Sequence, residues 1–149
     1  MIITIIENME EVDIMDNRYG RQDVPEKMLA GLKEDKYWGF IQSIYADDEF
    51  TLKEIFMKAG TQSSMEYHLS KDEKYFIREG KLKLGLRIGR AQNKSIILEK
   101  GDVYHVPPGL MHMRMAIEDT TIIEWSNKDD DSDSNIVEDG KTYEFKESE

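Results

Sequence analysis

The chain has 149 residues and a formal net charge of −11, and it contains no cysteine. The acidic balance argues against binding to nucleic acid backbones or to anionic membranes. The lack of thiols excludes a disulfide framework and a thiolate metal site, so any bound metal must use His, Asp or Glu. The length is that of one domain, which can bury a hydrophobic core without covalent staples.

The negative charge is concentrated near the C-terminus. Residues 126–149 hold nine acidic residues and three lysines, a net charge of −6 that leaves −5 for the other 125 residues. We therefore expect a mildly acidic body followed by an acidic tail that keeps the protein soluble. The apolar run at residues 1–6 is too short to span a membrane and lacks the basic flank of a signal peptide. This favours a cytoplasmic protein.

Residues 1–35 are predicted to precede the main domain. Residues 2–6 have the pattern of a short strand, and the polar residues 7–22 that of a loop. A helix-start signal then begins at Asp23, an N-cap candidate followed by a proline in the first turn and by a glutamate. Because apolar residues recur on one face after this signal, the sequence predicts one short helix over residues 24–34, packed on the outside of a barrel.

From residue 36 onward the hydrophobic pattern changes to a period of two, which is typical of strands. We expect strands at residues 38–45, 50–58, 82–88, 95–98, 103–106, 110–117 and 120–126. Short strands at regular intervals with turn residues between them are typical of a double-sheet jelly roll. The barrel is assigned to residues 36–126 and the acidic tail to residues 127–149. Within the tail, residues 129–134 are expected to be mobile, while residues 136–145 could dock an extra strand.

One stretch of the chain carries most of the candidate metal ligands. Residues two apart in a strand point to the same face, so Glu66 and His68 should project together. A turn after His68 could aim Glu73 at the same point, and His112 is the candidate fourth ligand. Such a mixed oxygen and nitrogen site suits a divalent transition metal, namely Zn, Mn, Fe, Co or Ni. The ordinary alternatives are a surface carboxylate for Glu66, a pair with a neighbouring lysine for Glu73, and structural hydrogen bonding for His68.

These residues lie in two segments that resemble the two cupin motifs. The first motif is matched by Gly60, Glu66, His68, Glu73 and Gly80. The second is matched by residues 101–112, which read Gly-Asp-Val-Tyr-His-Val-Pro-Pro-Gly-Leu-Met-His. The resemblance covers roughly residues 36–139. It implies an all-β fold, the double-stranded β-helix or cupin jelly roll, to which the pattern above adds one short N-terminal helix.

The chain departs from the standard cupin motifs at two positions. Glu66 stands where the first histidine is usual, and Ala116 where an asparagine often ends the second motif. The first departure resembles the phosphomannose-isomerase-like cupins, in which that position usually holds glutamine. The resemblance therefore implies a metal-dependent enzyme that acts on a sugar or sugar phosphate as an aldose–ketose isomerase. It also implies a homodimer, in which the strand at residues 2–6 could be exchanged between the two subunits.

Two other function classes remain open. The first is a small cupin that binds a sugar at its metal without turning it over, and the second is a metal-dependent oxygenase or lyase. Oxygenase chemistry is less favoured, because with Glu66 in the first position a three-histidine site requires His105 to turn inward. We expect His105 to face outward and not to bind the metal.

Two further residues are candidates for catalysis. Arg114 should share a strand face with His112, and a buried guanidinium is well suited to a phosphate or carboxylate of the substrate. An internal salt bridge to Glu124 or to another acidic residue is the alternative. Glu124 lies in an apolar strand and is the candidate general base, which would move a proton between adjacent carbons while the metal stabilises an enediolate.

Overall fold

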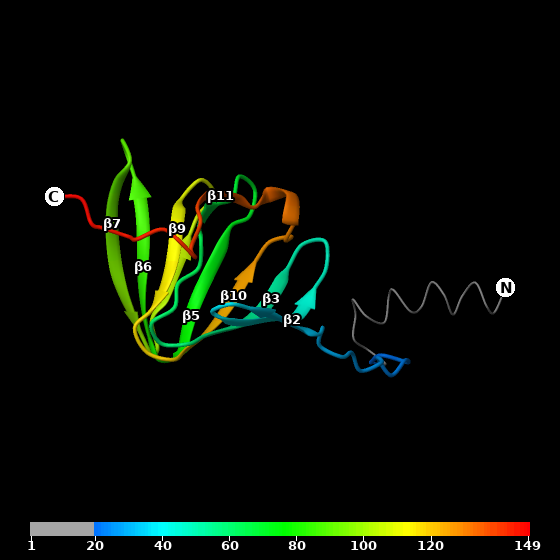
Figure 1. Cartoon of the computed structure of the whole chain (residues 1–149). Coiled ribbons are helices and arrows are strands. Elements are labelled where there is room, and N and C mark those ends of the chain that lie inside the picture. Colours follow the sequence, from blue (N-terminus) through cyan, green and yellow to red (C-terminus); the bar gives the residue numbers. More distant parts are fainter. Residues whose placement is uncertain (1–19) are drawn as a thin grey trace.

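The computed structural model describes residues 20–149, and these form two antiparallel sheets that face each other (Figure 1). The strands are β1 (Lys33–Lys36), β2 (Gly39–Ala46), β3 (Thr51–Met57), β4 (Met65–Tyr67), β5 (Glu73–Glu79), β6 (Lys81–Ile88), β7 (Gln92–Glu99), β8 (Val103–Val106), β9 (Met111–Ala116), β10 (Thr120–Ser126) and β11 (Asn135–Glu138). A short 3-10 turn, η1 (Asp131–Asp133), precedes β11. The predicted all-β jelly roll is confirmed. The strand expected at residues 2–6 and most of the loop expected at 7–22 lie outside the described residues.

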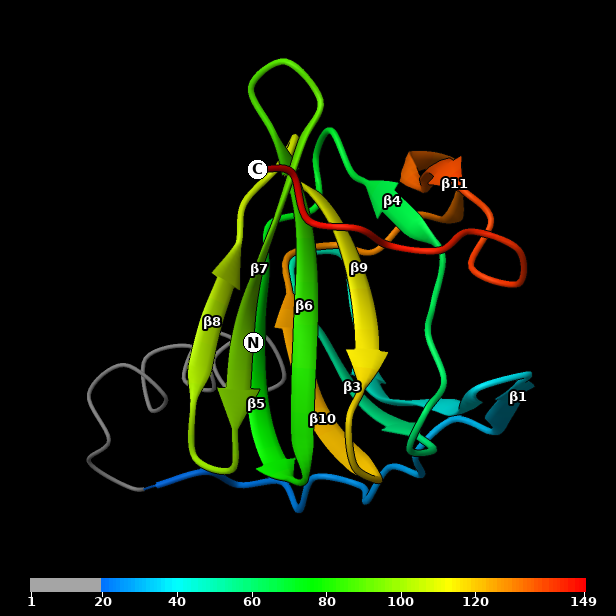
Figure 2. The ribbon, with the colours of Figure 1, turned by 60° about the vertical axis from the view of Figure 1, so that its left-hand side comes forward.

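The order of strands places distant parts of the chain opposite each other. One sheet has the order β1-β2-β3-β10-β5-β8, and the other the order β11-β4-β9-β6-β7. Strands β4 and β9 are neighbours in the five-stranded sheet, and β5 and β10 are neighbours in the six-stranded sheet (Figure 2). Since Glu66 and His112 lie on the first pair and Glu73 and Glu124 on the second, the predicted site residues face one another across the barrel.

Side chains point alternately into and out of the barrel along the strands, and those that point inward fill the space between the sheets. In β10, every second residue from Thr120 to Ser126 is buried and the residues between them are partly exposed. The apolar core consists of Trp38, Ile55, Met57, Tyr75, Ile77, Leu82, Leu84, Leu98, Val106, Ala116 and Ile122. Other buried positions hold ionisable side chains, namely His68, Lys71, Glu73, His112, Arg114 and Glu124. Buried charges need partners, so this polar part of the interior is where a functional site is expected.

The helix predicted over residues 24–34 is wrong. The chain has no regular secondary structure from Val24 to Leu32 and then enters β1, whose residues pair with β2. The Gly31 N–H donates to Ser43 O at 2.8 Å, so the backbone hydrogen bonds here go to a neighbouring strand. The helix signals are local, but a helix this short is marginal in water unless a packed face supports it, and here the apolar side chains Val24, Met28, Leu29 and Leu32 are 91%, 75%, 90% and 93% exposed. Within residues 20–149, no helix is long and apolar enough to cross a bilayer.

The C-terminal residues are docked on the outer face of the five-stranded sheet (Figure 2). β11 pairs with β4, which agrees with the expectation that an extra strand could dock here. Tyr143 Oη accepts hydrogen bonds from Arg87 Nη2 and Asn93 Nδ2, both at 2.9 Å. The Phe145 ring lies directly over Gly85, where an added Cβ would come within 2.8 Å of it. A glycine in the middle of β6 therefore makes room for the aromatic ring of the tail.

Replacing Phe145 with alanine is expected to loosen this segment. The change should lower the free energy of unfolding by roughly 1–2 kcal/mol, less than for a fully buried phenylalanine because the ring is only partly covered. Urea denaturation followed by fluorescence measures the loss. Glu144→Ala, which changes an exposed neighbour, is the matched control. Equal stability of Phe145→Ala and Glu144→Ala would show that the segment does not stabilise the barrel.

Candidate metal centre

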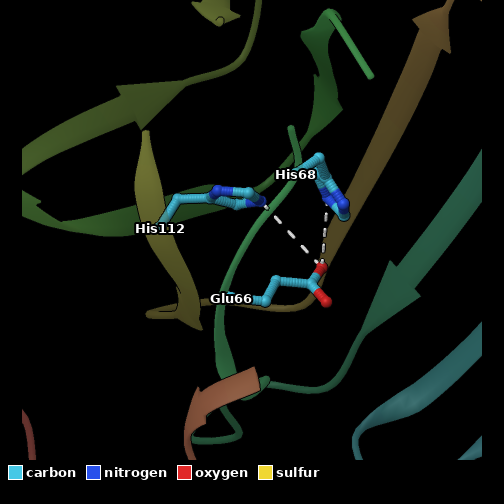
Figure 3. A group of neighbouring side chains, drawn as sticks. All are labelled: Glu66, His68 and His112. Carbon is cyan, nitrogen blue, oxygen red and sulfur yellow. Dashed lines mark ion pairs between the residues drawn. The ribbon is translucent and has the colours of Figure 1, made fainter. Parts of the chain in front are cut away.

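Three predicted ligands from the five-stranded sheet converge on one point. Glu66 lies in β4 and His68 directly after it, so both project into the barrel as their two-residue spacing predicts. His112 lies in β9, where it is the register partner of Glu66. One ligand atom from each of the three lies within 4.8 Å of the others. Glu66 Oε1 is 3.7 Å from His68 Nε2 and 4.0 Å from His112 Nε2 (Figure 3).

Glu73 reaches the same place from the opposite sheet. It begins β5 and is 1% exposed. Its Oε1 lies 3.0 Å from His112 Nε2, and its Oε2 lies 3.9 Å from His68 Nε2. The Tyr75 hydroxyl donates a hydrogen bond of 2.8 Å to Glu73 Oε1 and helps to fix the carboxylate. The structure thus brings all four predicted ligands together, with Glu73 beside the compact group of the other three.

The hydrogen bonds of the two imidazoles leave their inner nitrogens free for a metal. His68 Nδ1 lies 3.0 Å from Asp133 O, and His112 Nδ1 lies 2.9 Å from Leu110 O. A carbonyl oxygen can only accept, so each Nδ1 carries the proton and each Nε2 presents a lone pair. Among the described residues, both Nε2 atoms are buried without a hydrogen-bond donor, while Glu73 Oε2 lies 3.0 Å from Lys71 Nζ. Buried polar atoms without partners are rare, and their convergence fits a divalent cation.

Electrostatics support the need for a cation at this point. His112 Nε2 and Glu73 Oε1 lie 3.0 Å apart, and both are acceptors when the imidazole is neutral. Burial lowers the pKa of His112, but the Glu73 carboxylate more than offsets this, so the pKa ends above its ordinary value. A proton or a metal ion must therefore lie between the two groups. The cluster is consistent with a metal site built from imidazole and carboxylate.

A cavity of about 750 Å³ opens beside these ligands. Glu66 and His68 form part of its wall, together with Lys71, Arg114 and Glu124. Its volume lies within the range of pockets that hold small molecules. A ligand in this cavity would contact the metal on one side and charged side chains on the other.

Arg114 provides an unpaired cation in this cavity. It lies two residues after His112 on the same face of β9 and is 7% exposed. Its guanidinium lies over the ring of Trp38, 5.3 Å from the centroid. The salt bridge to Glu124 that the sequence left open is not formed, and the side chain makes no hydrogen bond or ion pair with any other residue in the range 20–149. A guanidinium held in this way is prepared to bind an anion.

Glu124 forms an ion pair with Lys71, which the sequence suggests only as a partner of Glu73. Lys71 Nζ lies 3.0 Å from Glu73 Oε2, 3.3 Å from Glu124 Oε2 and 3.5 Å from Asp129 Oδ1. Burial and the charge of Glu73 raise the pKa of Glu124 to about 7. Burial lowers the pKa of Lys71, but Glu124 and Glu73 outweigh it and raise the value, so the lysine stays charged. Lys71 and Glu73 are two residues apart, a spacing that can direct both side chains to the same side. This is the signal in the sequence that could have placed Lys71 beside the metal ligands.

Residues 50–144 match the family model for cupins. The chain belongs to the cupin family. No protein with a curated description matches it in sequence.

Solved structures show the same fold in proteins with little sequence identity to this cupin. The capsular polysaccharide assembling protein CapF from Staphylococcus aureus is 20% identical with a TM-score of 0.67, over 75% of this chain and 33% of CapF. A variant of oxalate decarboxylase from Bacillus subtilis is 12% identical with a TM-score of 0.66, over 77% of this chain and 34% of that one. KdgF from Halomonas sp. is 16% identical with a TM-score of 0.59, over 72% of this chain and 98% of KdgF. This cupin therefore spans about a third of the first two proteins and nearly all of the third.

The segment after the barrel supports the ligands of this cupin. Sequence reasoning predicted that residues 129–134 are mobile, but the structure shows them bonded to the ligand loop. The Asp133 carboxylate accepts hydrogen bonds from the backbone N–H groups of Leu69, Ser70 and Lys71 at 2.7, 2.9 and 2.9 Å. Ser134 Oγ donates to Glu66 Oε2 at 2.7 Å. These bonds orient Glu66 and the loop that follows His68, and no local sequence pattern reveals them.

Replacing Asp133 with alanine is therefore expected to weaken metal binding. Residues that orient metal ligands typically contribute a factor of about 10–100 in affinity, and this change releases the loop that follows His68. Competition with a chromophoric chelator measures the dissociation constant. Asp131→Ala removes a carboxylate from the same turn and should leave the affinity unchanged. If both variants bind metal as tightly as the native protein, Asp133 has no positioning role.

The third histidine lies away from the site. His105 is in β8, is exposed, and pairs with Asp72 on the outer surface. This agrees with the outward orientation expected from the sequence and leaves two histidines for the metal.

Proposed function

We propose that this cupin uses a divalent transition metal, Zn, Mn, Fe, Co or Ni, to act on a sugar or sugar phosphate, with the chemistry of an aldose–ketose isomerase. The observation that carries the proposal is the content of one cavity. Metal ligands, an unpaired guanidinium and a carboxyl group with a pKa of about 7 all face it. An anionic substrate with neighbouring oxygens offers a binding partner to the metal, to the guanidinium and to the carboxyl group.

The residues present fit the metal. Glu66, His68, Glu73 and His112 would hold the ion, since the two buried Nε2 atoms have no hydrogen-bond donor among the described residues and both carboxylates lie within 4.0 Å of them. When bound, the ion supplies a site for neighbouring substrate oxygens and stabilises the negative charge that develops when a carbon-bound proton leaves.

The other residues bind the substrate and move the proton. The planar guanidinium of Arg114, fixed over Trp38, binds a phosphate or carboxylate group through two parallel hydrogen bonds. Glu124 takes a proton from one carbon and returns it to the next, which its pKa of about 7 permits near neutral pH. Lys71, 3.3 Å from Glu124, stabilises the ionised form of this carboxylate before the first transfer and after the second.

The choice of a carbohydrate rests on the first motif. Glu66 stands in the position where the phosphomannose-isomerase-like cupins usually carry glutamine, and both side chains offer an oxygen ligand in place of an imidazole. The description of CapF as a capsular polysaccharide assembling protein is in keeping with this choice.

A substrate panel tests the proposal. The metal-loaded protein is incubated in deuterated water with hexose and pentose phosphates and with the corresponding free sugars, and the mixtures are followed by NMR. Conversion of an aldose to a ketose, with deuterium at the carbon that exchanged its proton, is the expected result. Stabilisation by one of these compounds without conversion would show a binding protein in place of an isomerase. Oxygen consumption on substrate addition would show an oxygenase.

Replacing Arg114 with glutamine should separate charged from neutral substrates. We expect KM or Kd for the phosphorylated compound to rise at least 10-fold, because a charged hydrogen-bonded contact contributes about 1.5–3 kcal/mol. The affinity for the matching free sugar should change little. An equal loss for both compounds would contradict the role of Arg114 as the anion-binding residue.

A further inference from the structure

The cavity beside the metal centre is larger than a single sugar phosphate requires. Its volume is about 750 Å³. Pockets of about 300–1,000 Å³ hold drug-sized ligands, which contain about twice as many atoms as a hexose phosphate. Space therefore remains after one sugar phosphate has been placed against the metal and Arg114. The residues that line this space indicate what a larger substrate carries there.

The buried floor of the cavity is its cationic end. Lys71, Arg114 and Glu124 lie there, and each is no more than 7% exposed. Lys71 is paired with Glu124 at 3.3 Å. The Arg114 guanidinium lies over the Trp38 ring and has no ion pair with another residue of the range 20–149. Together with a divalent ion on the neighbouring ligands, it attracts an anionic group to this end.

The exposed rim of the cavity has the opposite charge. Four acidic residues and one lysine line it, which gives a net charge of −3: Glu34, Asp47, Asp130, Asp131 and Lys128. The half-buried charged residues between floor and rim balance each other, since they are two lysines and two acidic residues: Lys36, Lys53, Glu66 and Asp129. Solvent screens each charge of the rim, but together they disfavour a second acidic group on the ligand.

The rim also presents apolar and aromatic side chains. Leu32, Tyr37 and Ile136 line it and are exposed. They come from the residue before β1, from the turn after β1 and from β11, so they surround the opening from different segments. A sugar unit has apolar C–H surfaces that pack against such side chains and hydroxyl groups that donate hydrogen bonds to carboxylates. A rim of carboxylates and apolar groups therefore suits a sugar unit that carries no acidic group.

From these two ends of one cavity we infer that the substrate is a carbohydrate of disaccharide size, with its anionic unit on the floor and a second, non-acidic sugar unit against the rim. This inference rests on the proposed function, because the metal and Arg114 hold the unit that reacts. That unit must keep its aldehyde free for the metal and its anionic group free for Arg114. The second unit is therefore attached through a hydroxyl between the two, such as O4 of a hexose 6-phosphate.

Binding of three matched compounds to the metal-loaded protein tests the inference by calorimetry. They are glucose 6-phosphate, cellobiose with phosphate on O6 of its reducing unit, and cellobiose with phosphate on O6 of both units. The cellobiose monophosphate should bind at least about 10-fold more tightly than glucose 6-phosphate, because the second unit adds packing contacts and hydrogen bonds. The second phosphate should abolish this gain. Equal or weaker binding of the cellobiose monophosphate, or a bisphosphate that binds as tightly as the monophosphate, would overturn the inference.

Variants of the rim test where the second unit lies. Leu32→Ser combined with Ile136→Ser should bring the ratio of the Kd for glucose 6-phosphate to the Kd for the cellobiose monophosphate close to one. Ile97→Ser, which changes an exposed residue of β7 outside the cavity, is the matched control and should keep the native ratio. Glu34→Lys combined with Asp131→Lys should restore tight binding of the bisphosphate. A native ratio in the Leu32/Ile136 variant would contradict the place of the second unit.

Turnover of the same compounds separates this inference from the isomerase proposal. Tighter binding of the cellobiose monophosphate without isomerisation would leave the two-unit ligand in place and refute the isomerase. Isomerisation of glucose 6-phosphate with a kcat/KM at least equal to that of the cellobiose monophosphate would support the isomerase and refute the larger substrate. If none of the three compounds binds, both proposals are wrong.

Discussion

Replacing His112 with alanine is expected to reduce metal affinity by more than 100-fold. The change removes one of two imidazole ligands, whose loss should exceed the roughly 10–100-fold effect of residues that only orient a ligand. It also removes the Nε2 atom that lies 3.0 Å from Glu73 Oε1. In elemental analysis, protein purified without added metal should retain a metal ion in the native form and lose it in the variant.

Thermal unfolding provides a second readout of the same change. Metal at about 100 times its dissociation constant should stabilise the native protein by about 2.7 kcal/mol. For a domain of this size, that corresponds to a rise in Tm of about 5–10 °C. The His112→Ala variant should show no rise. His105→Ala is the matched control, because His105 is exposed and paired with Asp72, and it should behave as the native protein. Full metal retention by His112→Ala would contradict the assignment of His112 as a ligand.

Replacing Glu124 with glutamine is expected to lower kcat by a factor of about 10²–10⁴ on the substrate that the panel identifies, the usual contribution of a general base. Glutamine has nearly the same shape but cannot take up a proton, so metal content and substrate affinity should change little. Lys71 keeps its contact with Glu73 in the variant, which limits the structural effect. Stopped-flow or NMR rates with saturating substrate measure the loss.

The control for this change must separate proton transfer from charge. Glu124→Asp keeps the carboxylate but draws it back by one methylene, so it should retain more activity than glutamine while binding the metal equally well. If Glu124→Gln turns over substrate at the native rate, the proton is carried by another group. If it loses metal together with activity, Glu124 acts on the metal centre rather than on the substrate.

The residues of the metal centre were predictable because strand geometry is regular. Two-residue spacing places Glu66 and His68 on one face, and the alternation along β9 places His112 and Arg114 on one face. The likeness to the two cupin motifs then joined segments that are distant in sequence. Local periodicity combined with motif order was enough to predict the fold and the proximity of Glu66, His68 and His112.

The features that sequence reasoning missed depend on contacts between distant segments. The signals for a helix at residues 24–34 are genuine local preferences, but the backbone of Gly31 and of residues 33–36 bonds to β2 instead. Asp133 lies more than 60 residues from the loop that it binds, so no spacing rule connects the two. Whether Arg114 pairs with Glu124 depends on side-chain distances across the barrel, and Lys71 takes the place beside Glu124 instead.

Anomalous diffraction from a crystal grown with a divalent transition metal tests the central claim most directly. Data collected at the absorption edge of that metal should show one dominant peak inside the barrel, about 2.0–2.2 Å from His68 Nε2 and His112 Nε2 and from an oxygen of Glu66 or Glu73. A barrel without such a peak, or a peak held by surface carboxylates away from the two imidazoles, would contradict the account.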